Sequence, residues 1–437
     1  MKVRIEKMGI NGEGIGYINR KPVFVPEVLI GEEAEVEVDD NFKTYAVGRS
    51  KKLYTFSDER ITPKCNIQRR CGACPLMITN YKNQCAIKFD GLKQSLIKYA
   101  QVNPRLIQPM MTNNLAFNYR NQFKLPFSMN EERQLTTGMY QPNSNYFNEV
   151  EKCIIHERDL ERVRLDILKV LNNYQSRSYD YHQKRGFRSL VVRGFDENYQ
   201  VTLVTGEEIL SPTMIEALMK IRGVVSLWQS VNTIKKTPEI FGPKMVLLAG
   251  ERYLPLKIKD LKLNVSPRSF FQLNTTQAVK LYECIADMIP ANQKLIVEAY
   301  SGIGGISMFI KDKATEIIGI ESVKDAVVNA NANAKENKAD NVTFVCADAA
   351  DKTTYYSKNR TIDVLVVDPP RSGLDDAMLD CIMKSKIKTI IYVSCNPATL
   401  GKNLAILRER YDVKTVQPID MFSQTAHIES VVQLQRR

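Results

Sequence analysis

The chain has 437 residues, of which 44% are apolar and 25% are charged, and this composition is that of a globular protein and not of a disordered one. At this length we expect two to four domains. No apolar run approaches the roughly 20 residues that cross a bilayer, and residues 1–6 lack the core of a signal peptide. We therefore expect a cytoplasmic protein without membrane association.

Charge and the rarer residue types narrow the possible functions. A net charge of +12 favours a polyanionic partner such as nucleic acid, although solvated surface charge explains many basic proteins equally well. Nine cysteines, an odd number, indicate free thiols, metal ligands or a nucleophile and not a disulfide framework. Because there are only three histidines, acid–base roles are expected to fall to carboxylates.

The N-terminal segment has the pattern of a small β-barrel. Short alternating runs at 3–5, 22–26 and 33–38 are separated by glycine turns. Residues 1–54 hold nine basic and nine acidic side chains, so the positive excess lies elsewhere. Between residues 57 and 110 there are nine basic residues against three acidic ones, which makes this stretch the stronger candidate for phosphate contacts. The basic residues are Arg60, Lys64, Arg69, Arg70, Lys82, Lys88, Lys93, Lys98 and Arg105.

A cysteine cluster lies within this basic stretch. Cys65, Cys71 and Cys74 have the spacing C-x5-C-x2-C, which is typical of a metal or iron-sulfur site in a protein without disulfides. Cys85 is the nearest fourth thiol, but it falls on an apolar helix face with Phe89, Leu92 and Leu96 and is expected in the core. Cys153 is the alternative, and His156 keeps a Cys/His zinc site open.

The C-terminal region from about residue 266 alternates apolar strands with helical segments. Strands are expected at 295–300, 316–321, 342–346, 363–368 and 389–393. This alternation predicts a mainly parallel, doubly wound α/β sheet. Residues 110–265 are of mixed pattern and contain no catalytic motif.

A glycine-rich turn follows the first of these strands. Gly302, Gly304 and Gly305 would let the backbone approach a nucleotide-type cofactor, and Glu321 ends the next strand, where an acid can bind both ribose hydroxyls. The alternative for Glu321 is a solvated carboxylate at a helix start. NAD and S-adenosylmethionine both satisfy this geometry.

Three reactive groups follow the later strands. Asp368, in the sequence Asp-Pro-Pro-Arg, ends one strand, and Cys395, in Ser-Cys-Asn-Pro, ends the next. A thiolate that adds to carbon 6 of a pyrimidine makes carbon 5 nucleophilic toward a methyl sulfonium, and a base such as Glu429 must then remove the carbon 5 proton. The helix expected after Pro397 could lower the pKa of Cys395. The alternatives are a buried core thiol and an exposed carboxylate on an edge strand.

At these residues the chain resembles the RNA uracil-C5 methyltransferases, particularly the iron-sulfur type that makes 5-methyluridine in 23S ribosomal RNA. Residues 394–400 resemble the nucleophile motif and residues 426–429 the motif that carries the general base. The resemblance implies Cys395 as nucleophile and Glu429 as base. It also implies a set of S-adenosylmethionine positions, namely Gln272, Tyr300, Glu321 and Asp368, with Asp348 as a weaker candidate near the adenine.

The resemblance also implies a domain organisation and a second cofactor. Residues 1–56 would form an OB-like TRAM barrel that binds RNA, residues 57–265 an α+β central domain, and residues 266–437 a Rossmann-like methyltransferase domain. The helical segment at about 80–105 is a candidate to pack on the methyltransferase domain. A [4Fe-4S] cluster would be held by Cys65, Cys71, Cys74 and Cys153, and Arg120 would lie near the RNA.

The implied substrate is a single-stranded or loop uridine of 23S ribosomal RNA, with no obligatory protein partner. A transfer RNA substrate is the closer alternative, because residues alone do not separate the two. A noncatalytic RNA-binding or assembly factor is the alternative from another class, and intact candidate residues at Cys395, Glu429, Glu321 and Asp368 argue against it.

Overall fold

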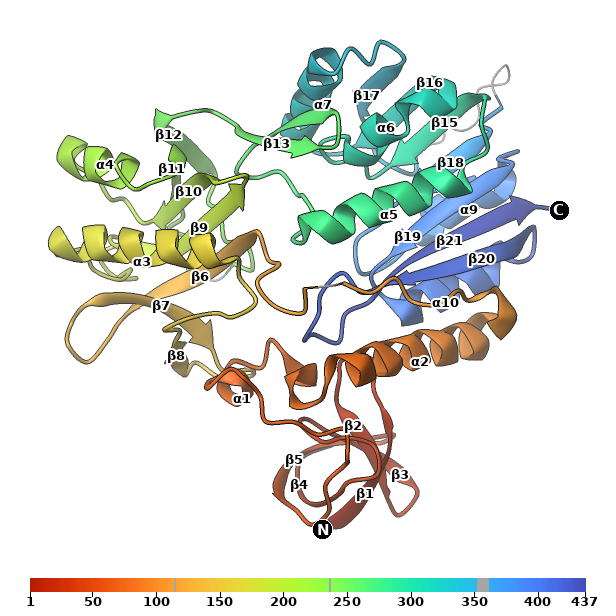
Figure 1. The fold of residues 1–437 in the computed structure, drawn as a ribbon, viewed down its shortest axis with the longest axis horizontal. Coiled ribbons are helices and arrows are strands. Elements are labelled where there is room, and N and C mark those ends of the chain that lie inside the picture. The colour runs from red at the N-terminus through yellow and green to blue at the C-terminus, as the bar shows by residue number, and fades with distance from the viewer. Residues whose placement is uncertain (114, 236, 352–360) are drawn as a thin grey trace.

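The computed structural model describes residues 1–113, 115–235, 237–351 and 361–437, and its N-terminal segment is a closed five-stranded barrel (Figure 1). The strands, in barrel order, are β1 (Lys2–Met8), β2 (Gly14–Ile18), β3 (Lys21–Val25), β5 (Ala46–Leu53) and β4 (Glu33–Asn41). Their inward side chains, such as Val3, Ile5 and Val23, form a small separate core. A short, alternating apolar pattern thus closes on itself and leaves no exposed edge.

A second sheet of seven strands forms the centre of the chain, in the order β12-β11-β10-β9-β6-β7-β8. Its strands are β6 (Gln122–Met129), β7 (Leu135–Tyr140), β8 (Phe147–Glu149), β9 (Phe187–Phe195), β10 (Asn198–Thr205), β11 (Val224–Val231) and β12 (Lys244–Gly250). Helices α3 (Arg158–Asn173) and α4 (Pro212–Met219) contribute Leu160, Ile167 and Leu218 to a core shared with these strands. The amphipathic helices therefore cover one apolar face of the sheet.

The third sheet has the order β17-β16-β15-β18-β19-β21-β20, and its first five strands are parallel. The strands are β15 (Gln293–Ala299), β16 (Ala314–Glu321), β17 (Val342–Cys346), β18 (Val364–Val367), β19 (Thr389–Ser394), β20 (Tyr411–Ile419) and β21 (Glu429–Arg436). Strand β21 runs antiparallel to both of its neighbours. The five strands expected from the sequence all belong to this sheet.

Helices cover both faces of the third sheet. They are α5 (Thr275–Met288), α6 (Gly305–Phe309), α7 (Lys324–Glu336), α9 (Asp376–Lys384) and α10 (Pro397–Leu407). A hairpin of β13 (Leu254–Ile258) and β14 (Leu261–Val265) precedes α5. The remaining short elements are α1 (Gln68–Cys71) and the 3₁₀ turns η1 (Pro75–Ile78), η2 (Pro104–Leu106) and η3 (Lys311–Lys313). Two apolar cores result, one on each side of the sheet.

Helix α2 (Tyr81–Ala100) lies on the methyltransferase-like sheet although it comes early in the chain. It packs on α10, and Figure 1 shows it between the barrel and that sheet. Leu92 and Leu96 are buried in the same core as Leu400 and Leu404. Gly401 permits the close crossing, because a Cβ there would lie 3.0 Å from the Ser95 carbonyl oxygen.

One expectation about α2 is wrong. Lys88 was a candidate for phosphate contact, but only 3% of it is exposed, and its ammonium group pairs with a buried carboxylate. A local count of charges does not reveal which face of a helix will be covered by a distant segment. Within the described residues, no helix has the length and apolarity needed to span a membrane.

Candidate active site

The candidate catalytic residues meet at the carboxyl ends of the central parallel strands. Asp368 follows β18, and Cys395 follows β19. Glu429 is the first residue of β21, and the pairing of Ser394 with Ser430 places it beside the end of β19. Ligand sites in open α/β sheets lie at this edge, so the sheet brings together three groups that are distant in sequence.

Cys395 is held as a thiol by its surroundings. Its pKa is raised to about 11, chiefly by burial and then by the nearby carboxylates of Glu429 and Asp368, while the cation of Arg371 opposes the rise. The expectation that the start of α10 would lower this pKa is therefore not met. Helix α10 does begin at Pro397, where the Asn396 side chain caps it through the Ala398 N–H at 3.1 Å. Burial of the sulfur and the two nearby carboxylates raise the thiol pKa by more than the positive end of a short helix lowers it.

The two carboxyl groups of the site are also perturbed. Glu429 is only 5% exposed, and burial followed by the charge of Asp368 holds its pKa well above the usual range. Burial raises the pKa of Asp368 to about 7. An acid whose pKa is raised by burial takes up a proton more readily, which is the property expected of a general base.

The turn after β15 is shaped for a cofactor. Tyr300 has a φ of +64° and Gly304 a φ of +81°, and a Cβ on Gly304 would lie 2.2 Å from the Phe344 ring. Glu321, at the end of β16, accepts hydrogen bonds from the Gly302 N–H at 3.0 Å and from the Val323 N–H at 2.9 Å. Backbone strain that is retained in this way is common where a ligand is bound.

The other expected cofactor residues lie around this turn. The pKa of Tyr300 is raised to about 12, chiefly by burial and then by the charges of Asp375 and Asp348, so Asp348 lies within electrostatic reach of Tyr300. Gln272 is buried in the loop before α5, where its carbonyl oxygen accepts from Asn121 Nδ2 at 3.1 Å. The charge of Asp368 acts on both Cys395 and Glu429. Gln272 instead contacts Asn121, the residue just before strand β6 of the central sheet.

Glu298 is a site residue that the sequence analysis did not single out. It is 1% exposed, and its carboxylate accepts from the Ser307 N–H at 2.8 Å at the start of α6. Burial raises its pKa to about 8, with Asp368 and Glu321 adding to the effect of burial and the bonds from Ser307 opposing it. An acidic residue inside an otherwise apolar strand is the signal that could have identified it.

The four predicted cysteine ligands line one cavity of about 100 Å³: Cys65, Cys71, Cys74 and Cys153. Burial raises the pKa of Cys153 to about 11. Cys85 does not line this cavity, and Asp420 is among the charges that act on it. His156 also lines the cavity, but its Nδ1 contacts Glu161 at 2.6 Å and its ring stacks on Phe123. The thiols therefore converge, while the imidazole is already engaged.

The four thiols line the same cavity. Within the part of the chain that the structure describes, no three His, Cys, Asp or Glu side chains are grouped closely enough to hold one metal ion. Four thiols around one cavity are a donor set that both zinc and iron-sulfur clusters use.

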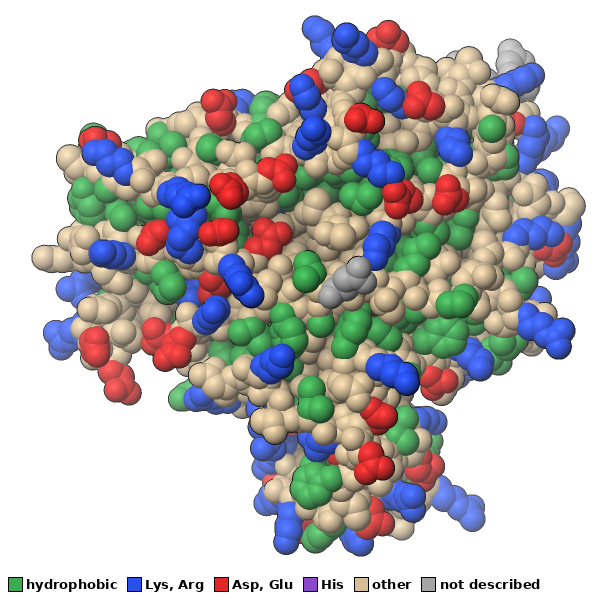
Figure 2. Space-filling view, viewed as in Figure 1, with side chains coloured by type: hydrophobic (Ala, Val, Ile, Leu, Met, Phe, Trp, Pro, Cys, Tyr) green, Lys and Arg blue, Asp and Glu red, His purple; other side chains and the backbone are tan. Residues whose placement is uncertain are grey.

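The barrel reaches the mouth of the candidate site. Arg371 Nη2 donates to Asn11 Oδ1 in the β1–β2 loop at 3.4 Å. A Cβ on the neighbouring Gly12 would lie 3.2 Å from Ala426, three residues before Glu429. The barrel also carries aromatic rings at its surface, with Phe42 stacked on Tyr45, and Lys and Arg side chains lie along its flanks (Figure 2). Exposed rings among cations are typical of single-stranded nucleic-acid binding.

Comparisons with known proteins cover the full chain. A family model described as tRNA (uracil-5-)-methyltransferase matches residues 244–437, and one described as the TRAM domain matches residues 1–50. A Bacillus cereus protein named as an uncharacterized RNA methyltransferase is 34% identical over 445 residues, which cover 100% of this chain and 96% of that protein. A Listeria innocua protein of the same description is 34% identical over 444 residues, covering 99% and 97%.

A solved structure shares the fold. The tRNA (uracil-54, C5)-methyltransferase of Pyrococcus abyssi, in complex with S-adenosyl-L-homocysteine, superposes with a TM-score of 0.78 at 23% identity, covering 99% of this chain and 100% of that one. The predicted fold class, an α/β methyltransferase domain with an N-terminal OB-like barrel, is thereby confirmed.

The pKa of Cys395 generates a prediction that needs no substrate. Since its thiol is protonated at neutral pH, alkylation of Cys395 by iodoacetamide should accelerate about tenfold per pH unit between pH 7 and pH 9. Glu429→Gln removes a carboxylate that raises this pKa, so alkylation should become faster wherever Glu429 is ionised. Peptide mass spectrometry of timed samples measures both rates. A plateau near pH 8.5, the usual thiol value, would contradict the burial argument.

Proposed function

The chain belongs to the RNA uracil-5-methyltransferase family, and from this premise we propose that it methylates carbon 5 of uridine in 23S ribosomal RNA through a covalent adduct on Cys395. The observation that carries the mechanism is the placement of Cys395 and Glu429 at the ends of paired strands, with the Asp368 charge acting on both. A partly buried thiol beside the buried Glu429 and the partly buried Asp368 suits addition followed by proton removal.

The proposed reaction follows from the chemistry of uracil. The Cys395 sulfur forms a bond to carbon 6, and the electrons of the carbon 5–carbon 6 double bond become available at carbon 5. S-Adenosylmethionine, when bound, supplies the electrophilic methyl group and leaves as S-adenosylhomocysteine. Glu429 then takes the carbon 5 proton, the double bond reforms, and the carbon 6–sulfur bond breaks. At the first step the proton of the Cys395 thiol must pass to a base, for which the neighbouring Asp368 carboxylate is our candidate. Glu429 must be ionised when it takes the carbon 5 proton.

The cofactor residues are proposed on the geometry of the turn after β15. Glu321 has both carboxylate oxygens oriented by backbone N–H donors, which leaves lone pairs for ribose hydroxyls. Tyr300 has its strained backbone at the same turn. With Gln272 and Asp368 these residues would hold S-adenosylmethionine.

We also propose that Cys65, Cys71, Cys74 and Cys153 hold a [4Fe-4S] cluster. Support comes from four converging thiols around a shared cavity and from the engagement of His156 with Glu161, which disfavours a Cys/His zinc site. Because methyl transfer to uracil requires no electron, the cluster would act on structure and RNA positioning.

Two RNA classes remain candidates for the substrate. The cysteine array favours 23S ribosomal RNA, through its resemblance to the iron-sulfur type, whereas the matching family model is described by a transfer RNA activity. To test this, the protein is incubated with methyl-labelled S-adenosylmethionine and either unmodified 23S ribosomal RNA or unmodified transfer RNA. The nucleosides of each RNA are then analysed for label. Label in 5-methyluridine from ribosomal RNA alone supports the proposal, and label from transfer RNA alone replaces it. No 5-methyluridine from either would favour a noncatalytic RNA-binding factor.

The nucleophile is tested by mechanism-based trapping. RNA that contains 5-fluorouridine should become covalently attached to the protein, because fluorine cannot leave as a proton. Cys395→Ala should abolish the denaturation-resistant complex seen on gels. Cys284→Ala, which alters a buried thiol on α5, is the control and should trap normally. Trapping by Cys395→Ala would remove this residue from the nucleophile role.

The base is tested with ordinary RNA. Glu429→Gln keeps the shape of the side chain but cannot accept a proton, so the methylated adduct should accumulate and turnover should fall by about 10² to 10⁴, the usual contribution of a general base. Gel electrophoresis measures the adduct, and nucleoside analysis measures turnover. Glu409→Gln, at an exposed carboxylate just after α10, is the matched control. Normal turnover in Glu429→Gln would exclude Glu429 as the base.

The proposed cluster is tested by composition. Protein purified without oxygen should contain about four iron and four sulfide per chain, and Cys153→Ser should lower both values. Stoichiometric zinc without sulfide would replace the cluster with a zinc site.

A further inference from the structure

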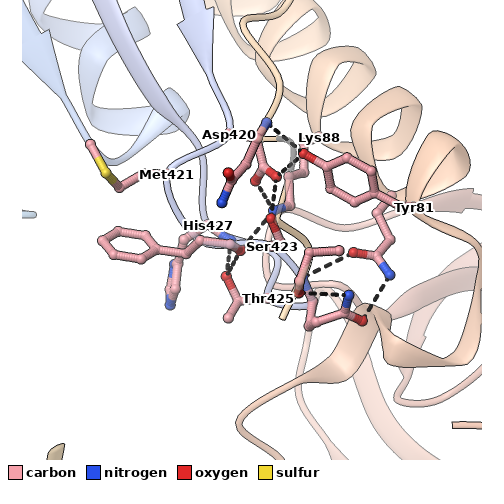
Figure 3. Close-up of polar contacts among 12 residues, drawn as sticks. Tyr81, Lys88, Asp420, Met421, Ser423, Thr425 and His427 are labelled. Atoms are coloured by element: carbon pink, nitrogen blue, oxygen red, sulfur yellow. Dashed lines mark hydrogen bonds and ion pairs between the residues drawn. The ribbon is translucent and has the colours of Figure 1, made fainter. Parts of the chain in front are cut away.

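The loop between β20 and β21 is unusually buried for a connection. Asp420, Met421, Ser423 and Gln424 are each at most 2% exposed, and the loop leads directly to Glu429. Loops normally run over the surface, since buried backbone polar groups need partners. The partners in this loop come from segments far away in sequence, and Figure 3 shows several of them gathered around Asp420.

Lys88 of α2 provides the central contact. Its Nζ donates to Asp420 Oδ1 at 2.6 Å and to the Phe422 carbonyl oxygen at 2.9 Å, and the Lys88 and Asp420 side chains are 1% and 0% exposed. Tyr81 and Ser423 hydroxyls donate to Asp420 Oδ2 at 2.7 and 2.8 Å (Figure 3). A buried ion pair adds little net stability, and its best-attested use is to specify one geometry.

A second set of contacts fixes Gln424, which has a φ of +72°. Its backbone N–H donates to Gln84 Oε1 at 2.9 Å, and its carbonyl oxygen accepts from the Leu76 N–H at 3.1 Å. Its side-chain oxygen accepts from Gln84 Nε2 at 3.0 Å. A strained conformation persists only where the surroundings determine it so completely.

The loop is also held from the methyltransferase side and from the cysteine cavity. Gln277 of α5 donates to the Asp420 carbonyl oxygen at 2.8 Å, and Asn274 donates to that of Met421 at 3.1 Å. Tyr119, next to the cavity-lining Arg120, donates to the Ser423 carbonyl oxygen at 2.8 Å. Three parts of the chain therefore determine the path of one loop.

We propose that Lys88 is a positioning residue for the methyl-transfer reaction, which holds the 420–428 loop so that the Glu429 carboxyl group stands at carbon 5 of the target uridine. This inference rests on the proposed function. It assigns α2 a role in the chemistry, although α2 contributes no group that touches the substrate.

Lys88→Met tests the proposal in the full-length protein. The substitution should lower kcat by about ten- to a hundredfold, because a catalytic group that is misplaced by about 1 Å can lower the reaction rate by up to about 10². The KM for S-adenosylmethionine should change less than kcat, since Tyr300 and Glu321, at the turn proposed to bind it, have no described contact with the 420–428 loop. Removal of the carbon 5 proton should become slower in this variant. With RNA deuterated at carbon 5 of uridine, Lys88→Met should therefore show a larger kinetic isotope effect than the unaltered protein, and the covalent protein–RNA adduct should accumulate.

The matched control is Lys384→Met. Lys384 pairs with Asp380 at 2.8 Å on the surface of α9, with the side chains 63% and 40% exposed, so the same chemical change should leave kcat and the isotope effect unaltered. An unchanged kcat and isotope effect in folded Lys88→Met would overturn the proposal.

A double variant separates positioning from stability. Lys88→Met with Asp420→Asn removes both charges, so no unpaired carboxylate remains buried and folding should recover. If kcat recovers together with the thermal midpoint, Lys88 is only structural and the proposal is wrong. If kcat stays low, the proposal is supported even when Lys88→Met alone does not fold.

A readout without RNA distinguishes this inference from the proposed function. Glu429 raises the pKa of Cys395, so displacement of Glu429 should speed alkylation of Cys395 in the Lys88→Met, Asp420→Asn protein, as Glu429→Gln does. If the unaltered protein methylates no RNA, the proposed function fails, while this alkylation shift still decides whether Lys88 positions Glu429. An alkylation rate equal to that of unaltered protein would count against it.

Discussion

Antiparallel pairing between β21 and β19 is the contact on which the candidate site depends. The preceding strands are parallel and bring Asp368 and Cys395 to one edge of the sheet, but a further parallel strand would begin at the opposite edge. Because β21 runs in the reverse direction, its first residue, Glu429, lies where β19 ends. One reversal of direction therefore places a carboxyl group beside a thiol.

The same proximity determines the electrostatics. The three groups share a desolvated edge, so each favours its protonated form. The charge of Asp368 raises the pKa of both Cys395 and Glu429, and the charge of Glu429 raises that of Cys395. The barrel lies against this edge of the sheet, where Asn11 contacts Arg371 and Gly12 lies close to Ala426. The site thus depends on parts of the chain that precede the methyltransferase fold by hundreds of residues.

Local patterns were sufficient to predict five of the seven strands of the sheet, while the roles of the candidate residues were inferred from the family resemblance as well. Apolar β-branched runs mark β15, β18 and β19, since such strands are buried on both faces, and the residues after them belong to the carboxyl edge. The spacing of Cys65, Cys71 and Cys74 similarly indicated a shared site, and all three line one cavity.

Properties that depend on distant packing could not be predicted from local patterns. Lys88 counted as a surface charge because its partner, Asp420, lies in another region of the sequence. The pKa of Cys395 was expected to fall because the helix start is visible in the sequence, whereas the depth of burial is not. Glu298 is a different case, because its partner Ser307 is only nine residues away and an acid inside an apolar strand is visible in the sequence.

The position of α2 has a consequence for biosynthesis. Lys88 and Asp420 are 332 residues apart, so at about 5–20 residues per second the ribosome needs roughly 15 to 70 seconds to supply the partner of a helix that it has already made. During that interval the apolar side chains of Leu92 and Leu96 lack Leu400 and Leu404, with which they share a core in the folded protein. The barrel has a core of its own and can close early, whereas α2 cannot reach its final packing until the C-terminal region has been made.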